Sequence, residues 1–532
     1  MQTKQYVILA ILVAYMVFNV LMGIYMSRRN SGKNAGAGFF SNYFIGNRTM
    51  GGLVLAMTLV ATYTSASSFL GGPGLAASWG LTQSWVAVIQ IGTAFLTLGV
   101  LGKKLGIISR RINAVTISDY LKARYESPAV VIVCSLALVT FFITQMIAQF
   151  MGGAALLQTV TGLPYWAGLA LFALAVVLYT AVGGFTAVVI TDTIQGIVMT
   201  IGTFLLMFFV FHAGGGAANL IDQVDATVSG WNILGMGAGD EVSALSPGYL
   251  ISFWVLVGIG VMGLPQTAVR GMGFKDTKSL HSAMIYGTVV VGILMIGMHF
   301  IGALTGPLLP AEGIGSTDQV IPYIVLNYMP AWAGGIFLAA PLAAIMSTVD
   351  SLLLLASATI ISDIWLTYFA KDKAKGAASS FGGSEQANGG AAEGGREAAT
   401  GVGNGREAEA FKNKVKMYSL VLTIVIGLIV FACALKPPTI LVWVNLFALG
   451  GLEATFFWPL IGGLYWKHGN ANGSIAATVV GVATFVYFNT HKILPFHVHE
   501  IVAALLFSGI AYFIVSALTK KEPSEEVLEK CF

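Results

Sequence analysis

Two groups of polar residues lie inside long apolar stretches of this chain. The first, Ala61–Ser68, carries a run of hydroxyl side chains and is followed by Gly71-Gly72-Pro73-Gly74, which we expect to interrupt the helix. The second is Ala344–Thr348. Small hard cations prefer carbonyl, hydroxyl and carboxylate oxygens to nitrogen or sulfur. The two groups together therefore predict a cation site, with Na⁺ as the ion.

The spacing of these residues is suited to such a site. Ala61 and Thr64 would present backbone carbonyls at the interruption, because unwound backbone leaves carbonyls without helical partners. Ala344, Ser347 and Thr348 stand at i, i+3 and i+4 and share one helix face. The alternative is close helix packing, for which membrane proteins also use Ser and Thr. That alternative is preferred for a single hydroxyl, but two clusters favour the ion site.

Acidic residues inside apolar stretches mark a second candidate. Asp192 lies near the inner end of one stretch, and Asp350 follows Ser347 by three positions. An acid within a membrane span is costly and is by default a functional hypothesis. With Ser351, these acids predict a second cation site or an inward release path. The alternative is a hydrated vestibule on the cytoplasmic side.

The composition defines the elements that must position these residues. The chain has 532 residues, of which 56% are hydrophobic and only 10% are charged. Soluble domains average about 25% charged residues, so a polytopic membrane protein is indicated. The apolar runs are continuous, not alternating, which argues against a membrane barrel. There is no nucleophile–base pair, phosphate loop or metal-type cysteine spacing, and we predict that the protein is not an enzyme.

About thirteen segments contain the roughly 20 apolar residues that a spanning helix needs. They are expected at 6–26, 49–70, 81–102, 129–158, 164–184, 187–212, 249–270, 283–306, 332–360, 416–435, 440–465, 472–490 and 497–518. Lys and Arg cluster after the odd-numbered spans, which predicts an outside N-terminus and an inside C-terminus. We interpret Arg270, at the end of span seven, as one of these cytoplasmic anchors.

A second weakened helix supports an internal repeat. Span seven contains Gly258, Gly260, Gly263 and Pro265, and it lies five spans after the first interrupted helix. Interrupted helices at matching positions are typical of inverted repeats in transporters. We therefore predict an all-α fold with a five-plus-five inverted repeat over spans 2–6 and 7–11.

The chain is expected to form a single transporter domain over residues 1–520. Residues 371–411 are rich in Gly, Ala, Ser and Glu, which predicts a flexible cytoplasmic linker. A tolerated insertion is favoured there over a regulatory segment. Residues 104–125 alternate basic and apolar groups and predict an interfacial helix. Residues 521–532 would be a short cytoplasmic tail.

Several polar side chains within the spans could reach a solute, although each alone is more readily explained as a helix–helix hydrogen bond. They are Gln83, Gln90, Gln145, Gln149, Asn445 and Glu453.

The chain resembles the sodium:solute symporter family. The matching stretches run from about residue 43 to 467 and are Tyr43–Arg48, Ser65–Gly74, Leu178–Phe185, Thr191–Gln195, Ser252–Val257, Gly263–Arg270, Phe337–Thr348 and Gly450–Ala454. The resemblance implies a thirteen-span inverted-repeat fold and coupling to Na⁺. It assigns the main sodium site to the residues that spacing also selects, namely Ala61, Thr64, Ala344, Ser347 and Thr348.

The resemblance also bears on a second sodium ion. In members that have one, its acid would correspond to Asp192, with Ser347 and Ser351 nearby. This chain departs from their pattern, because Asp350 stands where those members carry a serine.

A further departure concerns the solute. Proline carriers have an aspartate at the position of Tyr63, so this chain lacks a negative charge where an anionic solute would approach. Tyr63, Ser65 and Ser68 are therefore the candidates for binding a solute carboxylate, with Gln90 facing them from span three.

Within the family, the resemblance is greatest to pantothenate carriers, whereas other members carry proline, sugars, sialic acid or monocarboxylates. It implies a secondary active transporter in the plasma membrane, expected to be a bacterial inner membrane, that imports pantothenate with Na⁺ by alternating access. The alternatives are Na⁺ symport of another small organic anion or amino acid and, more distantly, a sensor or channel on the same frame. Membrane lipid is an expected partner; no organic cofactor, nucleic acid or obligatory protein partner is expected.

Overall fold

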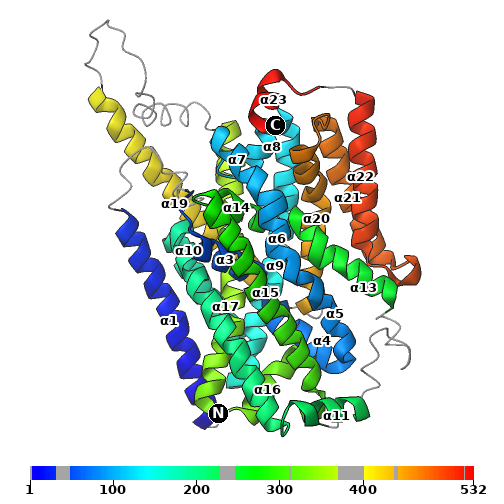
Figure 1. Cartoon of the computed structure of the whole chain (residues 1–532). Helices are drawn as coiled ribbons and strands as arrows, with labels where there is room; N and C mark the ends of the chain where they lie inside the picture. The colour runs from blue at the N-terminus through cyan, green and yellow to red at the C-terminus, as the bar shows by residue number, and fades with distance from the viewer. Residues whose placement is uncertain are drawn as a thin grey trace, which may run out of the picture.

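The chain forms a bundle of membrane-length helices (Figure 1). The computed structural model describes residues 3–31, 48–227, 246–310, 313–369, 401–436, 441–519 and 522–532. Within these ranges, 11 helices are long and apolar enough to cross a membrane, and two bent helix pairs raise the number of spans to as many as 13. The predicted all-α fold and number of spans are confirmed.

The first half of the chain contains the first bent pair. Its elements are α1 (Thr3–Ser31), α3 (Gly52–Tyr63), η2 (Ser67–Gly71), α4 (Gly72–Trp79), α5 (Leu81–Val88), η3 (Ile89–Gly92), α6 (Thr93–Phe95), η4 (Leu96–Gly102), α7 (Lys103–Arg111), α8 (Ile117–Tyr125), α9 (Pro128–Thr161), α10 (Tyr165–Ala213) and α11 (Ala217–Thr227). Helix α10 contains two spans because Gly184 has φ 65°, a left-handed conformation that glycine adopts without a steric penalty.

The second half contains the second bent pair. Its elements are α13 (Pro247–Trp254), η6 (Val255–Ile259), η7 (Gly260–Gly263), α14 (Pro265–Met272), α15 (Thr277–Leu304), η8 (Gly306–Leu308), η9 (Thr317–Gln319), α16 (Val320–Tyr328), α17 (Ala331–Ala358), η10 (Thr359–Phe369), α19 (Gly401–Ala434), α20 (Leu441–Tyr465), α21 (Ala471–His491), η11 (Pro495–His497), α22 (Glu500–Thr519) and α23 (Glu525–Cys531).

Helix α17 is the central element of the bundle. The most apolar window of its span is 100% buried, whereas that of α1 is 28% buried. Helix α17 packs against α1, α3, α9, α10 and α19, while α1 and α19 lie at one margin of the bundle (Figure 1). The residues predicted to bind a cation on α17 are therefore held away from lipid by neighbouring helices.

The two chain ends lie at opposite ends of the bundle (Figure 1). This arrangement fits an odd number of spans, as the distribution of basic residues predicts. Which end faces the cytoplasm stays a prediction.

The segments at the predicted cytoplasmic end are more helical than expected. Residues 370–400 of the predicted linker region lie outside the described residues, but α19 begins at Gly401. The helix therefore begins within the predicted linker, where residues 406–411 are mainly strong helix formers. The flexibility of the linker stays a prediction. The tail also folds: α23 packs against α7 and α8, the helices of the predicted interfacial segment, and buries Val527 and Cys531.

Candidate functional site

The first broken helix bends at Thr64 and Ser65, between α3 and η2. Thr64 is extended, with φ −69° and ψ 141°, and the helices on either side meet at 73°. The break thus comes earlier than the predicted Gly71–Gly74. Pro73 lies where η2 continues directly into α4: Gly71 and Gly72 are both helical, and the Gly72 N–H bonds the Ser67 carbonyl five residues back. Gly74 serves packing, since a Cβ there would lie 1.9 Å from the Thr317 carbonyl oxygen.

The break leaves backbone carbonyls that α17 reaches with two hydroxyls. Ser347 Oγ lies 2.8 Å from the Ala61 carbonyl oxygen and 3.2 Å from that of Ala344. Thr348 Oγ1 lies 2.7 Å from the Thr64 carbonyl oxygen and 2.8 Å from that of Ala344. All five residues are at most 1% exposed. The structure therefore brings together every residue predicted for the main cation site.

This oxygen cluster has the chemistry of a monovalent-cation site. Its potential ligands are three carbonyls and two hydroxyls, the oxygen ligands that hard cations prefer. In the described part of the chain, no group of three or more His, Cys, Asp or Glu side chains could hold a metal ion. A cation in the cluster would thus be held by neutral oxygens.

A glutamine holds the backbone on the other side of the same break. The side-chain carbonyl of Gln149 accepts a hydrogen bond from the Ala66 backbone N–H at 2.9 Å. Its amide donates to Asn445 Oδ1 at 3.0 Å. Gln149 thus links the broken helix through α9 to α20, which agrees with its interpretation as a helix–helix contact.

Arg270 lies at the centre of the second candidate site. Its guanidinium forms an ion pair with Asp192, with Nη2 3.1 Å from Oδ2, and donates to Thr62 Oγ1 and Ser351 Oγ, the latter at 2.6 Å. Thr58 Oγ1 donates to the same Asp192 oxygen at 2.6 Å. Arg270 is 1% exposed, so its interpretation as a cytoplasmic anchor is wrong.

Asp350 is connected to this network but has its own donor. Tyr179 donates to Asp350 Oδ2 at 2.5 Å, and Ser351 Oγ lies 3.3 Å from Asp350 Oδ1. The three residues predicted together, Asp192, Asp350 and Ser351, are thus all buried around one guanidinium. The bend at Leu264 places Arg270 there, because α14 departs from the preceding helix by 46°.

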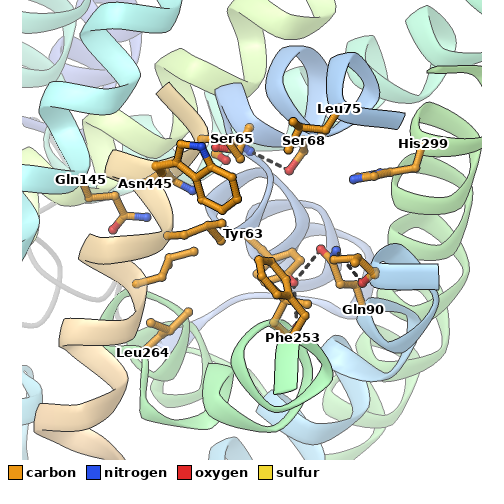
Figure 2. A pocket seen from close by; sticks show the side chains of 18 of the residues that line it. Tyr63, Ser65, Ser68, Leu75, Gln90, Gln145, Phe253, Leu264, His299 and Asn445 are labelled. Carbon is orange, nitrogen blue, oxygen red and sulfur yellow. Dashed lines mark hydrogen bonds between the residues drawn. The ribbon is translucent and has the colours of Figure 1, made fainter. Parts of the chain in front are cut away.

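The predicted solute residues line a cavity beside the first break (Figure 2). Tyr63 donates to Gln90 Oε1 at 2.8 Å and lies 3.0 Å from the Val257 carbonyl oxygen. Ser68 Oγ accepts from the Ser65 backbone N–H at 3.3 Å. The cavity has a volume of about 70 Å³, whereas ligand pockets are typically about 300–1,000 Å³. A solute can therefore bind only if the walls move apart.

A larger cavity adjoins the first. It has a volume of about 660 Å³, and three residues line both cavities: Tyr249, Trp443 and Leu446. These side chains form the wall between the two spaces. Rotation or displacement of this wall would join them into one passage.

Comparison with known proteins identifies the family of this chain. A family model described as "Sodium:solute symporter family" matches residues 43–380 and 404–481. The chain belongs to the sodium:solute symporter family. It is 42% identical over 517 residues to the sodium/pantothenate symporter of Escherichia coli (strain K12), covering 97% of this chain and 98% of that protein. It is 40% identical to the sodium/pantothenate symporter of Haemophilus influenzae, covering 91% of each.

A solved structure agrees on the fold. A substrate-bound, outward-open Na⁺-coupled sialic acid symporter superposes with a TM-score of 0.75 at 19% identity, covering 97% of this chain and 99% of that one. Together with the family match and the similarity to sodium/pantothenate symporters, this establishes the chain as a multi-pass membrane symporter coupled to Na⁺, a transporter and not an enzyme.

Some residues of the symporter's cavity were not selected from the sequence. His299 points into the cavity from α15 (Figure 2), and its Nδ1 lies 2.8 Å from the Met295 carbonyl oxygen. Because a carbonyl only accepts hydrogen bonds, Nδ1 carries a proton, and a neutral imidazole keeps Nε2 as an acceptor. A lone histidine in an apolar span gives no sequence signal of this role. The aromatic lining residues Tyr249, Phe253 and Trp443 gave none either.

Proposed function

We propose that this symporter imports pantothenate together with Na⁺. The observation that carries the proposal is the continuity of the two sites at one break, where Thr64 contributes to the oxygen cluster and Ser65 lines the cavity. Binding of an ion and of a solute would stabilise the same backbone conformation. The identity of 42% with a sodium/pantothenate symporter supports the choice of solute.

The cavity lining is suited to a polar solute with a single carboxylate. Amide and hydroxyl groups face the cavity from several helices, and no Lys or Arg is among the described residues that line it. We propose that the solute's carboxylate replaces Gln90 as the acceptor of the Tyr63 hydroxyl. It would also accept hydrogen bonds from Ser65 and Ser68. The remaining amides, including Gln145 and Asn445, would bind the solute's amide and hydroxyl groups.

We assign the coupling ion to the oxygens of Ala61, Thr64, Ala344, Ser347 and Thr348. The cluster joins the broken helix to α17, so Na⁺ would hold these two elements together in the conformation that binds solute. Release of Na⁺ would free Ser347 and Thr348 from the break. This gives a physical basis for coupling, because the ion and the solute favour the same arrangement.

We propose that Asp192, Asp350 and Ser351 serve an inward release path and do not bind a second sodium ion. Two of the oxygens that such an ion would need, Asp192 Oδ2 and Ser351 Oγ, already accept hydrogen bonds from Arg270. A guanidinium in that position supplies a fixed positive charge. Symport of one Na⁺ with a solute of one negative charge would then be electroneutral.

Uptake in proteoliposomes tests the proposal. Labelled pantothenate should accumulate above its external concentration only with an inward Na⁺ gradient. Unlabelled pantothenate should compete, whereas proline, sialic acid and simple monocarboxylates should not. Competition by one of those solutes in place of pantothenate would establish the rival symporter, and uptake that never exceeds equilibrium would indicate a channel.

A further inference from the structure

Glu453 is a buried acid that the proposed transport mechanism does not use. It lies on α20 and is 0% exposed. Neither of its carboxylate oxygens has a hydrogen-bond partner among the described residues. It is not part of either cavity described above. Its position therefore requires a different explanation from those of Asp192 and Asp350, which both have donors.

The second broken helix covers this carboxyl group. A Cβ at Gly260 would lie 2.2 Å from Glu453 Oε2 and 3.1 Å from Oε1, and one at Gly263 would lie 3.1 Å from the Glu453 Cα. Glycine at these positions lets the backbone of η7 lie directly on the acid. The bend at Leu264 follows immediately. Glu453 is thus packed against the part of the chain where the second helix breaks.

The titratable groups on the elements around α20 form no hydrogen bond with Glu453, and most of them have other partners. Arg124 and Tyr125 of α8 bond the carbonyls of Gly463 and Pro459, near the end of α20. Tyr512 of α22 bonds Tyr125. On the remaining neighbouring elements, Cys134 of α9 contacts Thr478, Tyr63 donates to Gln90, and Glu500 pairs with Lys492. None of these groups donates to Glu453.

An ionised carboxylate at this position would be very unfavourable. A buried charge without a partner costs far more than a neutral polar group, and such a group takes up a proton instead. The cost is greater inside a membrane, where water cannot solvate the charge. A neutral carboxylic acid removes this penalty and can still donate a hydrogen bond.

We propose that Glu453 is a proton-binding site controlled by the second break. It holds a proton while η7 is packed against it, and it exchanges that proton only when the broken helix moves away. Protonation then stabilises the packed conformation, and deprotonation stabilises the separated one. Because Leu264, Gln266 and Thr267 line the solute cavity just beyond η7, separation would also open the cavity wall.

Infrared spectroscopy of the purified protein tests protonation without requiring transport. The wild type should show the carbonyl stretch of a protonated carboxylic acid at neutral pH. In Glu453→Gln one component of this band should be missing, whereas Glu500→Gln, which alters an acid that already has partners, should keep the whole band. A spectrum that is the same in the wild type and Glu453→Gln would overturn the proposal.

Deuterium exchange in the wild-type protein adds a test that needs no variant. In D₂O the acid band should shift slowly without solute and faster when Na⁺ and solute are present, because a bound solute holds the cavity walls, and with them the break, away from the acid. Exchange that is immediate in both conditions would contradict control by the break. This measurement decides the proposal even if Glu453→Gln does not fold.

The pH dependence of uptake tests the functional consequence, which rests on the proposed symport. At a fixed Na⁺ gradient, the solute concentration for half-maximal wild-type uptake should decrease at alkaline pH, by up to about tenfold per pH unit, because deprotonation favours the separated conformation that admits the solute. Glu453→Gln, which mimics the protonated acid, should keep a constant value. An identical pH profile in both proteins would overturn the coupling. Failure of pantothenate as the solute would leave the infrared result unaffected.

Discussion

The two broken helices of this symporter are built alike but are stabilised differently. Each lies beside an acid on another span, Asp192 at the first break and Glu453 at the second. Asp192 has an arginine and a threonine as partners, whereas Glu453 has none among the described residues. At the first break, backbone carbonyls also accept hydrogen bonds from hydroxyls of α17. At the second break, glycines allow the backbone to pack closely against α20.

This difference indicates how the two halves divide their tasks. A break held by charges and hydroxyls can respond to an ion, because a cation competes for the same oxygens. A break packed on a neutral acid responds instead to whatever separates the two surfaces. The first half would then respond to Na⁺ binding. In the second half, movement of the broken helix would change whether Glu453 holds a proton.

The largest expected effect comes from removing the charge partner at the first break. Arg270→Met should destabilise the protein by about 3–5 kcal/mol, because Asp192 is left as an uncompensated buried charge. Thermal unfolding in detergent measures the loss.

Adding Asp192→Asn to Arg270→Met should recover part of the stability, since the buried charge is then gone. Arg124→Met is the matched control: Arg124 is equally buried but bonds only carbonyls. An Arg270→Met protein as stable as the wild type would show that the pair is not what holds this break.

A smaller but functional effect is expected at the oxygen cluster. Ser347→Ala should weaken Na⁺ stimulation of uptake by about tenfold or more, because loss of one oxygen ligand to a charge costs about 1.5–3 kcal/mol. The concentration of Na⁺ for half-maximal uptake is the measurement. Ser357→Ala is a suitable control, since Ser357 is also buried on α17 but donates only to the Leu354 carbonyl. If Ser347→Ala and Ser357→Ala had the same Na⁺ dependence, the oxygen cluster would not be the site of the coupling ion.

The sequence predicted this cluster well because its determinants are local. Hydroxyls at i+3 and i+4 from Ala344 must share a face whatever the tertiary structure. The number of spans is likewise local, since it depends on the length of apolar runs. The position of the first break was harder, because Gly71–Gly74 has the composition of a break but is used for close packing.

Arg270 and Glu453 illustrate what the sequence could not provide. A cation near the end of a span normally lies in water, and only the direction of the bend at Leu264 carries Arg270 inward. The lack of partners around Glu453 depends on neighbours from several distant segments. Such properties arise from tertiary packing, so no spacing rule along the chain predicts them.

A modest effect is expected in the solute cavity. Tyr63→Phe removes the hydroxyl that donates to Gln90, a contribution of about 0.5–1.5 kcal/mol. Under the proposed role of Tyr63, the solute concentration for half-maximal uptake should rise by about threefold to tenfold, with Na⁺ dependence unchanged. Kinetics of pantothenate uptake at saturating Na⁺ would measure this. A change in Na⁺ dependence with unchanged solute affinity would indicate that Tyr63 contributes to ion binding and not to solute binding.

The smallest effect should come from an ion pair that resembles Arg270–Asp192 only in chemistry. Lys492 Nζ lies 3.0 Å from Glu500 Oε1, yet the Lys492 side chain is 65% exposed. Water already solvates this ammonium group, and exposed pairs contribute about 0–1 kcal/mol. Lys492→Met should therefore change the unfolding temperature little, and raising the salt concentration should remove the remaining difference. If Lys492→Met were as damaging as Arg270→Met, burial would not be what distinguishes the charge network of the first break, and the contrast between the two halves would need another cause.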